Sequence, residues 1–249
     1  MSRENILFAA VGLLLGYVIA FHLVFHINQR EPSAQGRAAS AAGAPGGAAV
    51  PTNDVKDRQR LTSAAESAAQ AARDDAQNFD AQLRAGNAAL EAGDSEGAID
   101  FLTRAVELRP ADSQAVVRLG HAYFEAKRYE TAERWYSEAL KKKPEDADVR
   151  SDLGLTFFLR EPPQTERALA EFRRALEYDP QHVPTLHNLT LVQMKTGDMA
   201  GAETSLARLE KLDPEGNNVP LLRRELEKTR AAGAEKPAAD KKKNNPPAG

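Results

Sequence analysis

Four prolines recur at a nearly constant interval through the middle of the chain, at positions 110, 144, 180 and 214, which are 34, 36 and 34 residues apart. Upstream of each proline lies an alanine with the same spacing, and a bulky residue follows that alanine four positions later. The alanine and bulky pairs are Ala98 and Leu102, Ala132 and Tyr136, Ala168 and Phe172, and Ala202 and Leu206. Proline cannot continue a helix, and a period in this range is typical of stacked helical pairs. The middle of the chain is therefore predicted to be a helical solenoid.

The second copy carries the most complete pattern, VRLGHAYFEAKRYETAERWYSEALKKKP at residues 117–144. It resembles the tetratricopeptide repeat, in which small residues allow two helices to cross closely and aromatic residues fill the space beside the crossing. The residues that carry the resemblance, and that we expect to pack the repeats, are Gly86, Ala98, Leu119, Gly120, Tyr123, Ala132, Tyr136, Gly154, Phe157, Ala168, Phe172 and Ala202. The first and fourth copies match less well, as terminal repeats do.

The resemblance implies an all-α fold, a right-handed superhelical solenoid of helix-turn-helix repeats. Four repeats are expected at residues 79–112, 113–146, 147–182 and 183–216. An Ala-rich helix at 55–78 precedes them, and a capping helix at 217–230 covers the edge of the last repeat. The remaining segments are an Ala/Gly/Pro-rich linker at 31–54 and a polar tail at 231–249, which we expect to be disordered.

The N-terminal segment 1–30 is predicted to be a transmembrane anchor. Residues 6–27 contain no Asp, Glu, Lys or Arg, and 22 such residues are long enough for a bilayer core of roughly 30 Å. This apolar run exceeds the core of a cleavable signal peptide, although ASA at 39–41 leaves cleavage open. The short N-terminus and the linker favour an extracytoplasmic body, and the resemblance implies the bacterial inner membrane as the location. Basic residues flank both ends of the span, so the orientation is poorly encoded.

Two patterns lie inside this span. Gly12, Gly16 and Ala20 share one helical face and could form a membrane dimer face, or could be ordinary glycine usage in a membrane helix. His22 and His26 are one turn apart and could ligate a metal or haem. The alternative for both histidines is a polar position near the membrane interface.

The sequence contains no pattern typical of an enzyme. It has no cysteine, and it lacks a glycine-rich phosphate loop, an HExxH motif and a nucleophile with an evident base partner. The net charge of −3 gives no basic face for nucleic acid. We therefore expect a non-enzymatic protein without cofactors that binds a protein or peptide partner.

In proteins of this repeat family the first helix of each pair lines the concave surface. The residues expected to form a partner-binding groove there are Arg84, Asn87, Leu90, Val117, Arg118, His121, Phe124, Leu155, Phe158, Leu191 and Met194. Of the family's clamp for a peptide carboxylate, Asn87 alone matches, since Leu83 replaces the first lysine and Asp148 and Asp152 replace a later basic pair. The groove residues could equally pack between neighbouring first helices.

Two functions fit this organisation. One is a membrane-tethered adaptor that holds a segment of a partner protein, as the resemblance implies for bacterial single-span proteins that assist envelope or membrane-complex assembly. The other is a structural subunit of a stable membrane complex, dimerising through its span or its capping helix, with no released client.

Overall fold

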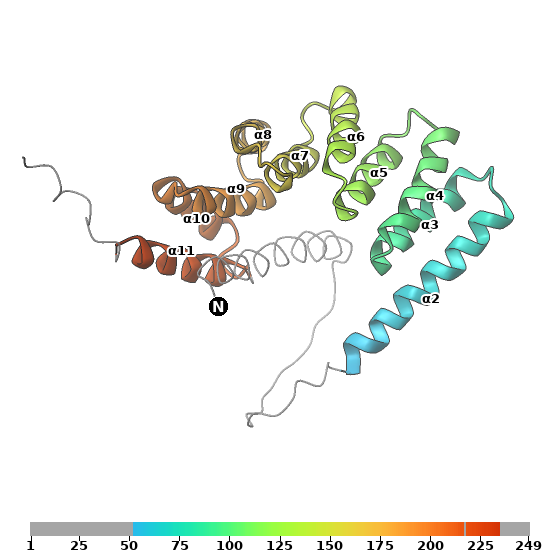
Figure 1. The fold of residues 1–249 in the computed structure, drawn as a ribbon, viewed down its shortest axis with the longest axis horizontal. Coiled ribbons are helices and arrows are strands. Elements are labelled where there is room, and N and C mark those ends of the chain that lie inside the picture. Colours follow the sequence, from blue (N-terminus) through green and yellow to red (C-terminus); the bar gives the residue numbers. More distant parts are fainter. Residues whose placement is uncertain (1–51, 217, 235–249) are drawn as a thin grey trace, which may run out of the picture. The chain divides into compact units, whose positions relative to one another are not determined.

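The computed structural model describes residues 52–216 and 218–234, which form ten α-helices and no strands (Figure 1). The helices are α2 (Thr52–Asp74), α3 (Phe79–Ala92), α4 (Ser95–Leu108), α5 (Ser113–Glu125), α6 (Tyr129–Lys142), α7 (Ala147–Leu159), α8 (Thr165–Tyr178), α9 (Val183–Thr196), α10 (Met199–Leu212) and α11 (Val219–Ala234). The all-helical repeat fold expected from the sequence is thus confirmed for the part of the chain that is described.

Aspartate side chains set the starts of several helices, because their carboxylates accept hydrogen bonds from backbone N–H groups that the first turn leaves unpaired. Asp94, Asp112, Asp146 and Asp198 cap α4, α5, α7 and α10 at distances of 2.9, 2.8, 3.2 and 3.0 Å. Two kinds of helix end recur. Left-handed glycines follow α3 and α9, and the recurring proline lies two residues beyond the end of α4, α6, α8 and α10.

The chain divides after Arg128 into two compact units, which are described separately. The first unit holds α2 to α5. Gly86 of α3 lies against Leu102 of α4, and an added Cβ at Gly86 would come within 2.4 Å of the Leu102 Cγ. A second cluster joins α2 to α3 through Ala72, Ala81 and Ala85, all of them buried. Small residues therefore bring both helix pairs of this unit close together.

The second unit holds α6 to α11. At Gly154 of α7 an added Cβ would lie 2.6 Å from the Phe172 Cε1 on α8, so this crossing resembles that of the first unit. Arg150 of α7 donates to Glu171 of α8 at 2.8 Å, with both side chains about nine-tenths buried at 12% exposure. The helices α7 and α8 are thus joined by an apolar contact and by an ion pair.

Three boundaries differ from the sequence-based expectation. The helix α2 spans 52–74 instead of 55–78, because Asn78 serves as the N-cap of α3, where it accepts from the Ala81 N–H at 3.1 Å. The capping helix α11 continues to Ala234, four residues into the segment predicted to be a disordered tail. The helix α2 begins at Thr52, so its first three residues belong to the segment that was predicted to be the linker 31–54.

The predicted membrane segment lies outside the described residues, as do Gly12, Gly16, Ala20, His22 and His26. Within residues 52–216 and 218–234, no helix has both the length and the apolar character needed to cross a bilayer.

Candidate partner-binding surface

In the first unit, the predicted groove residues occupy one side of α3 and α5, here called the first-helix face. Arg84 is exposed, while Asn87 and Leu90 of α3 are half-buried. On α5, Val117, Arg118 and His121 are half-buried, and Phe124 is buried at 6% exposure. Of the apolar residues expected in the groove of this unit, Leu90 is therefore accessible and Phe124 is largely covered.

One atom of this face stands out. The side-chain oxygen Oδ1 of Asn87 is buried and has no hydrogen-bond partner among the described residues. A buried acceptor without a donor costs about 1–3 kcal/mol relative to a satisfied one. Arg84, on the same side of α3, is exposed and extends the polar character of the face. This end of the first-helix face therefore presents an exposed cation to a ligand, with the Asn87 acceptor lying beneath the surface beside it.

In the second unit the equivalent positions are more deeply buried. Leu155, Leu191 and Met194 are 2%, 5% and 7% exposed, and Phe158 is half-buried. Leu155, Leu191 and Met194 are therefore covered within the described chain, in line with the alternative that these residues pack between neighbouring helices. The helices α7 and α9 pack directly against each other, and this contact between neighbouring first helices covers part of these apolar side chains.

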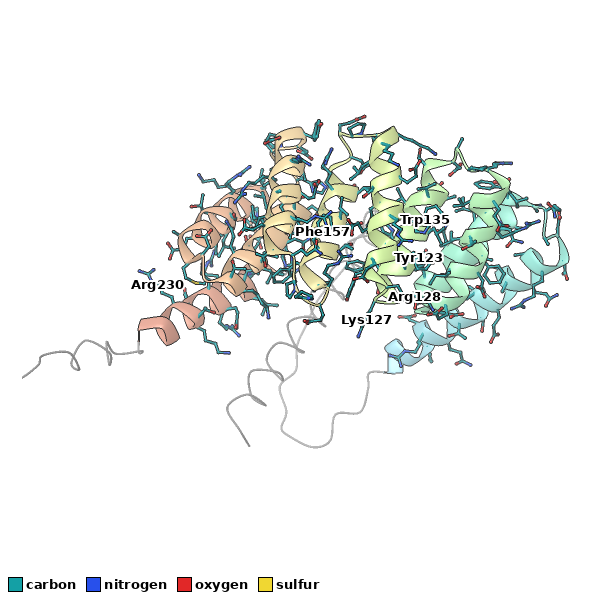
Figure 2. All side chains as sticks on the ribbon, turned by 45° about the horizontal axis from the view of Figure 1, so that its top comes forward. Tyr123, Lys127, Arg128, Trp135, Phe157 and Arg230 are labelled. Atoms are coloured by element: carbon teal, nitrogen blue, oxygen red, sulfur yellow. The ribbon has the colours of Figure 1, made fainter. Side chains whose placement is uncertain are left out.

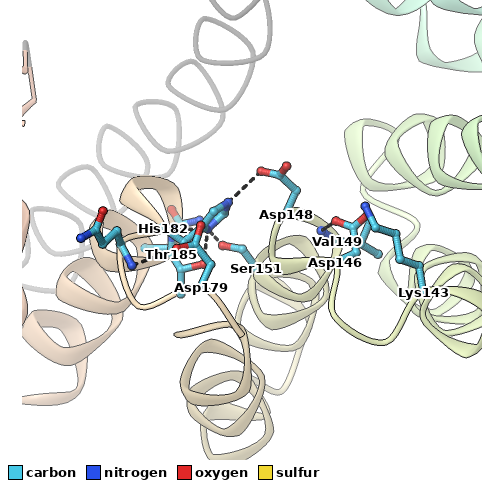
Figure 3. A network of polar contacts seen from close by, with 10 residues as sticks. Lys143, Asp146, Asp148, Val149, Ser151, Asp179, His182 and Thr185 are labelled. Carbon is cyan, nitrogen blue, oxygen red and sulfur yellow. Dashed lines mark hydrogen bonds and ion pairs between the residues drawn. The ribbon is translucent and has the colours of Figure 1, made fainter. Parts of the chain in front are cut away.

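Polar side chains mark the contact between α7 and α9 (Figure 3). Asn188 of α9 donates to the Ser151 hydroxyl of α7 at 3.1 Å, and this bond is buried. At the start of the same two helices, the His182 Nε2 lies 3.0 Å from the Asp148 Oδ1. We call these two contacts the α7–α9 polar rungs. They fix which residues of the two first helices face each other, because a shift along either helix would separate both pairs.

His182 has a second role, as the N-cap of α9. Its Nδ1 accepts from the Thr185 backbone N–H at 3.3 Å and lies 2.7 Å from the Thr185 hydroxyl. On the other side of the network, the Lys143 ammonium donates to Asp146 at 3.1 Å, and this bond raises the pKa of Lys143 (Figure 3). These groups belong to helix starts, and neither arrangement provides a nucleophile or a proton donor directed at a substrate.

The sequence did not indicate this polar network. Histidine is an uncommon N-cap, so His182 carried no helix-start signal. Asp148 was noted only as a replacement for a basic clamp residue. The available signal was the i, i+3 spacing of Asp148 with Ser151 on α7 and of Thr185 with Asn188 on α9, which places each pair on one side of its helix.

The predicted packing residues lie where helices cross or in helix interiors. Those of the first unit include Gly86, Ala98, Leu119 and Gly120, all of them buried, and Tyr123, which is half-buried (Figure 2). Phe157 of the second unit is 3% exposed, and the Arg167 guanidinium lies 3.8 Å from the centre of its ring. Among the described residues, no group of three or more His, Cys, Asp or Glu side chains could hold a metal ion.

Comparisons with known proteins agree on the fold. Two family models, both described as tetratricopeptide repeat, match residues 89–152 and 163–225 and residues 53–115. None of the curated proteins compared with the chain matches it significantly.

Three of the similar solved structures illustrate the likeness. MamA (residues 41 to the end) from Desulfovibrio magneticus RS-1 is 20% identical, with a TM-score of 0.56 over 66% of this chain and 92% of its own. PilW, described as a type IV pilus biogenesis factor, is 17% identical, with a TM-score of 0.60 over 73% and 82%. YrrB, described as having an unusual peptide-binding site, is 18% identical, with a TM-score of 0.53 over 70% and 88%.

These structures share the fold of this chain at low sequence identity. The first family model alone covers more than half of the 249 residues, and its matches fall on the helix pairs described above. The chain therefore belongs to the tetratricopeptide repeat family.

Proposed function

We propose that the chain is a membrane-tethered adaptor that holds an extended segment of a partner protein on the first-helix face of α3 and α5. The observation that carries the proposal is the buried Asn87 Oδ1, which lacks a donor among the described residues. Rotation of the half-buried Asn87 side chain toward solvent would allow a backbone N–H of a bound segment to supply that donor. Such contacts recognise a peptide backbone whatever its side chains are.

Charge and apolar surface support the same occupant. The exposed Arg84 guanidinium could pair with an acidic side chain or a terminal carboxylate of the segment. Leu90, one turn beyond Asn87, remains half-buried and could contact an apolar side chain. The likeness to YrrB, whose description names a peptide-binding site, agrees with this use of the fold.

The tether is the second part of the proposal. The uncharged run at 6–27 is long enough to span a bilayer, and the linker would separate it from α2. PilW, a pilus biogenesis factor of the same fold, agrees with a role in envelope assembly. A body held near the membrane would meet partner segments at a high effective concentration.

Site-specific photocrosslinking in the full-length protein tests the partner surface. A photoreactive amino acid at Arg84 should yield a discrete adduct in membranes. The same group at Asp100, an exposed residue on α4, should yield none. Equal adducts from both positions, or no adduct from Arg84, would refute binding at this face.

The Asn87→Ala variant sharpens the test. It should reduce the adduct formed at Arg84 while leaving the melting temperature nearly unchanged, because Oδ1 has no hydrogen bond to lose within the described chain. A large drop in melting temperature would instead assign Asn87 to the fold. An adduct whose partner stays bound in constant stoichiometry through purification would favour a structural subunit of a stable complex.

A further inference from the structure

The helix α2 occupies the place of a second helix in a repeat whose first helix is missing from the described chain. The second helix α4 spans 95–108 and is followed by four residues before α5 begins. Subtracting the 34-residue period gives 61–74, which is the last part of α2, and again four residues precede α3. The position of α2 and the length of the turn that follows it are therefore those of the second helix of a repeat. We call α2 a half-repeat.

In the complete repeats, second helices bury one face against the first helix of their own pair. The contacts are between α3 and α4, α7 and α8, and α9 and α10. Three positions on each of these second helices make up that face, and none is more than 4% exposed. They are Ala98, Leu102 and Ala105 on α4, Ala168, Phe172 and Ala175 on α8, and Ala202, Leu206 and Leu209 on α10.

The equivalent positions of α2 are open. Ala64 and Ala71 are exposed and Ala68 is half-buried, although their counterparts in the complete repeats are covered. Leu61, on the same side of the helix, is one of the few large apolar residues with an exposed side chain, at 36%. We call Leu61, Ala64, Ala68 and Ala71 the open face of α2; Ala68, at its edge, also touches the cluster that α2 shares with α3. The neighbouring side of α2, with Ala72 at 0% exposure, packs on α3.

The turn that precedes the second helix in other repeats has no counterpart in α2. In the first repeat the chain reverses at Gly93 and Asp94, between α3 and α4. The corresponding positions, 59 and 60, lie inside α2, which is one continuous helix from Thr52. The chain runs straight where the other repeats turn back, so the described residues contain no first helix for this half-repeat.

We propose that the open face of α2 binds the same face of a second copy of this chain, with the two helices antiparallel. A two-fold axis between positions 64 and 68 would place Leu61 on the partner's Ala71 and Ala64 on the partner's Ala68. Each contact would then occur twice, as in isologous dimers. The antiparallel direction is also that of a first helix relative to its second helix within a repeat.

Charge complementarity favours this occupant. Arg60 and Asp74 flank the open face on the same side of α2, near its two ends, and both are exposed. In the antiparallel pair, Arg60 lies beside the partner's Asp74, and the reciprocal pair forms at the other end. A parallel pair would instead place each charge and its copy on opposite sides of the interface, so that neither ion pair could form. Two symmetric ion pairs therefore select the antiparallel arrangement.

Disulfide trapping tests the geometry, because the natural chain has no cysteine. Two tagged full-length copies, one Leu61→Cys and the other Ala71→Cys, should crosslink in membranes under mild oxidation. Copies that both carry Leu61→Cys should not, since their α-carbons would lie about 15 Å apart along the helices, beyond the reach of a disulfide. Glu66→Cys, on the opposite side of α2, is the matched control. Crosslinking between two Leu61→Cys copies, or equal crosslinking at Glu66→Cys, would overturn the proposal.

Charge reversal supplies an independent readout. Arg60→Asp and Asp74→Arg should each weaken dimerisation of the full-length protein in detergent by about tenfold, as like charges come together twice. The double variant Arg60→Asp, Asp74→Arg should restore it. Helix content should stay constant, because both residues are exposed. A monomeric wild-type protein, or a double variant that stays weak, would refute the α2 pair.

Discussion

Backbone conformation at the turns inside the repeats is decided by single residues. Gly93 and Gly197 end α3 and α9 with φ of 81° and 84°, in the left-handed region that glycine adopts without steric cost. The second repeat has Lys127 at the equivalent position, with φ of 57°. Lysine adopts this conformation at a cost of about 1–2 kcal/mol. The turn at Lys127, which Figure 2 labels, is therefore strained, whereas the turns at Gly93 and Gly197 are not.

Replacing Lys127 with glycine should relieve this strain. We expect Lys127→Gly to raise the free energy of unfolding by about 0.5–1 kcal/mol, measured by urea denaturation. Gly197→Ala is the reverse control and should lower it by about 1 kcal/mol, since open space surrounds Gly197 and only the backbone opposes the change. If both substitutions left the midpoint unchanged, the turns would not be under the strain inferred here.

The buried Ser151–Asn188 bond makes a second prediction at this scale. Ser151→Ala would leave the Asn188 amide without its acceptor in a buried place, which should cost about 1–3 kcal/mol. The double variant Ser151→Ala, Asn188→Leu removes both polar groups and should recover part of the loss. A double-mutant cycle by thermal unfolding measures the coupling, and a value near zero would contradict a direct bond.

Pairs of helices pack closely where small residues lie at their crossings, and the crossing of α7 and α8 at Gly154 is the clearest example. Gly154→Ala should lower the free energy of unfolding by about 1–3 kcal/mol, because the added methyl meets the rigid ring of Phe172 at 2.6 Å. Phe172→Leu in the same chain should restore part of this loss by opening space. Calorimetry of both variants checks the prediction, and additive losses would show that the two residues do not meet.

The helices and their pairing within each repeat could be predicted from the sequence, whereas the contacts between neighbouring repeats could not. Proline spacing and the small residues at Ala98 and Ala168 depend only on local patterns, so the helices and their pairing could be foreseen. The half-repeat was missed because Ala64 and Ala71 do not stand out in an Ala-rich helix. The burial of Leu155 and Leu191 was left open because identical apolar residues line a groove or a helix contact, and only the stacking of α7 on α9 distinguishes them.

For the whole molecule, the proposed tether determines where the repeats act. The full-length chain should stay in the membrane pellet after alkaline carbonate extraction, whereas residues 52–249 should move to the supernatant. The reason is that the uncharged run at 6–27 is the only stretch of the sequence long enough to span a bilayer. Recovery of the full-length chain in the supernatant would contradict the anchor.

The α7–α9 polar rungs also constrain how this protein can change during evolution. Arrays of repeats commonly grow or shrink by duplication or loss of a whole unit, which is tolerated when neighbouring units present interchangeable apolar faces. Here Asp148 and Ser151 contact the repeat that follows, at His182 and Asn188. A unit inserted between the third and fourth repeats would bury these groups against the wrong neighbour. The third and fourth repeats should therefore be inherited together, in this order.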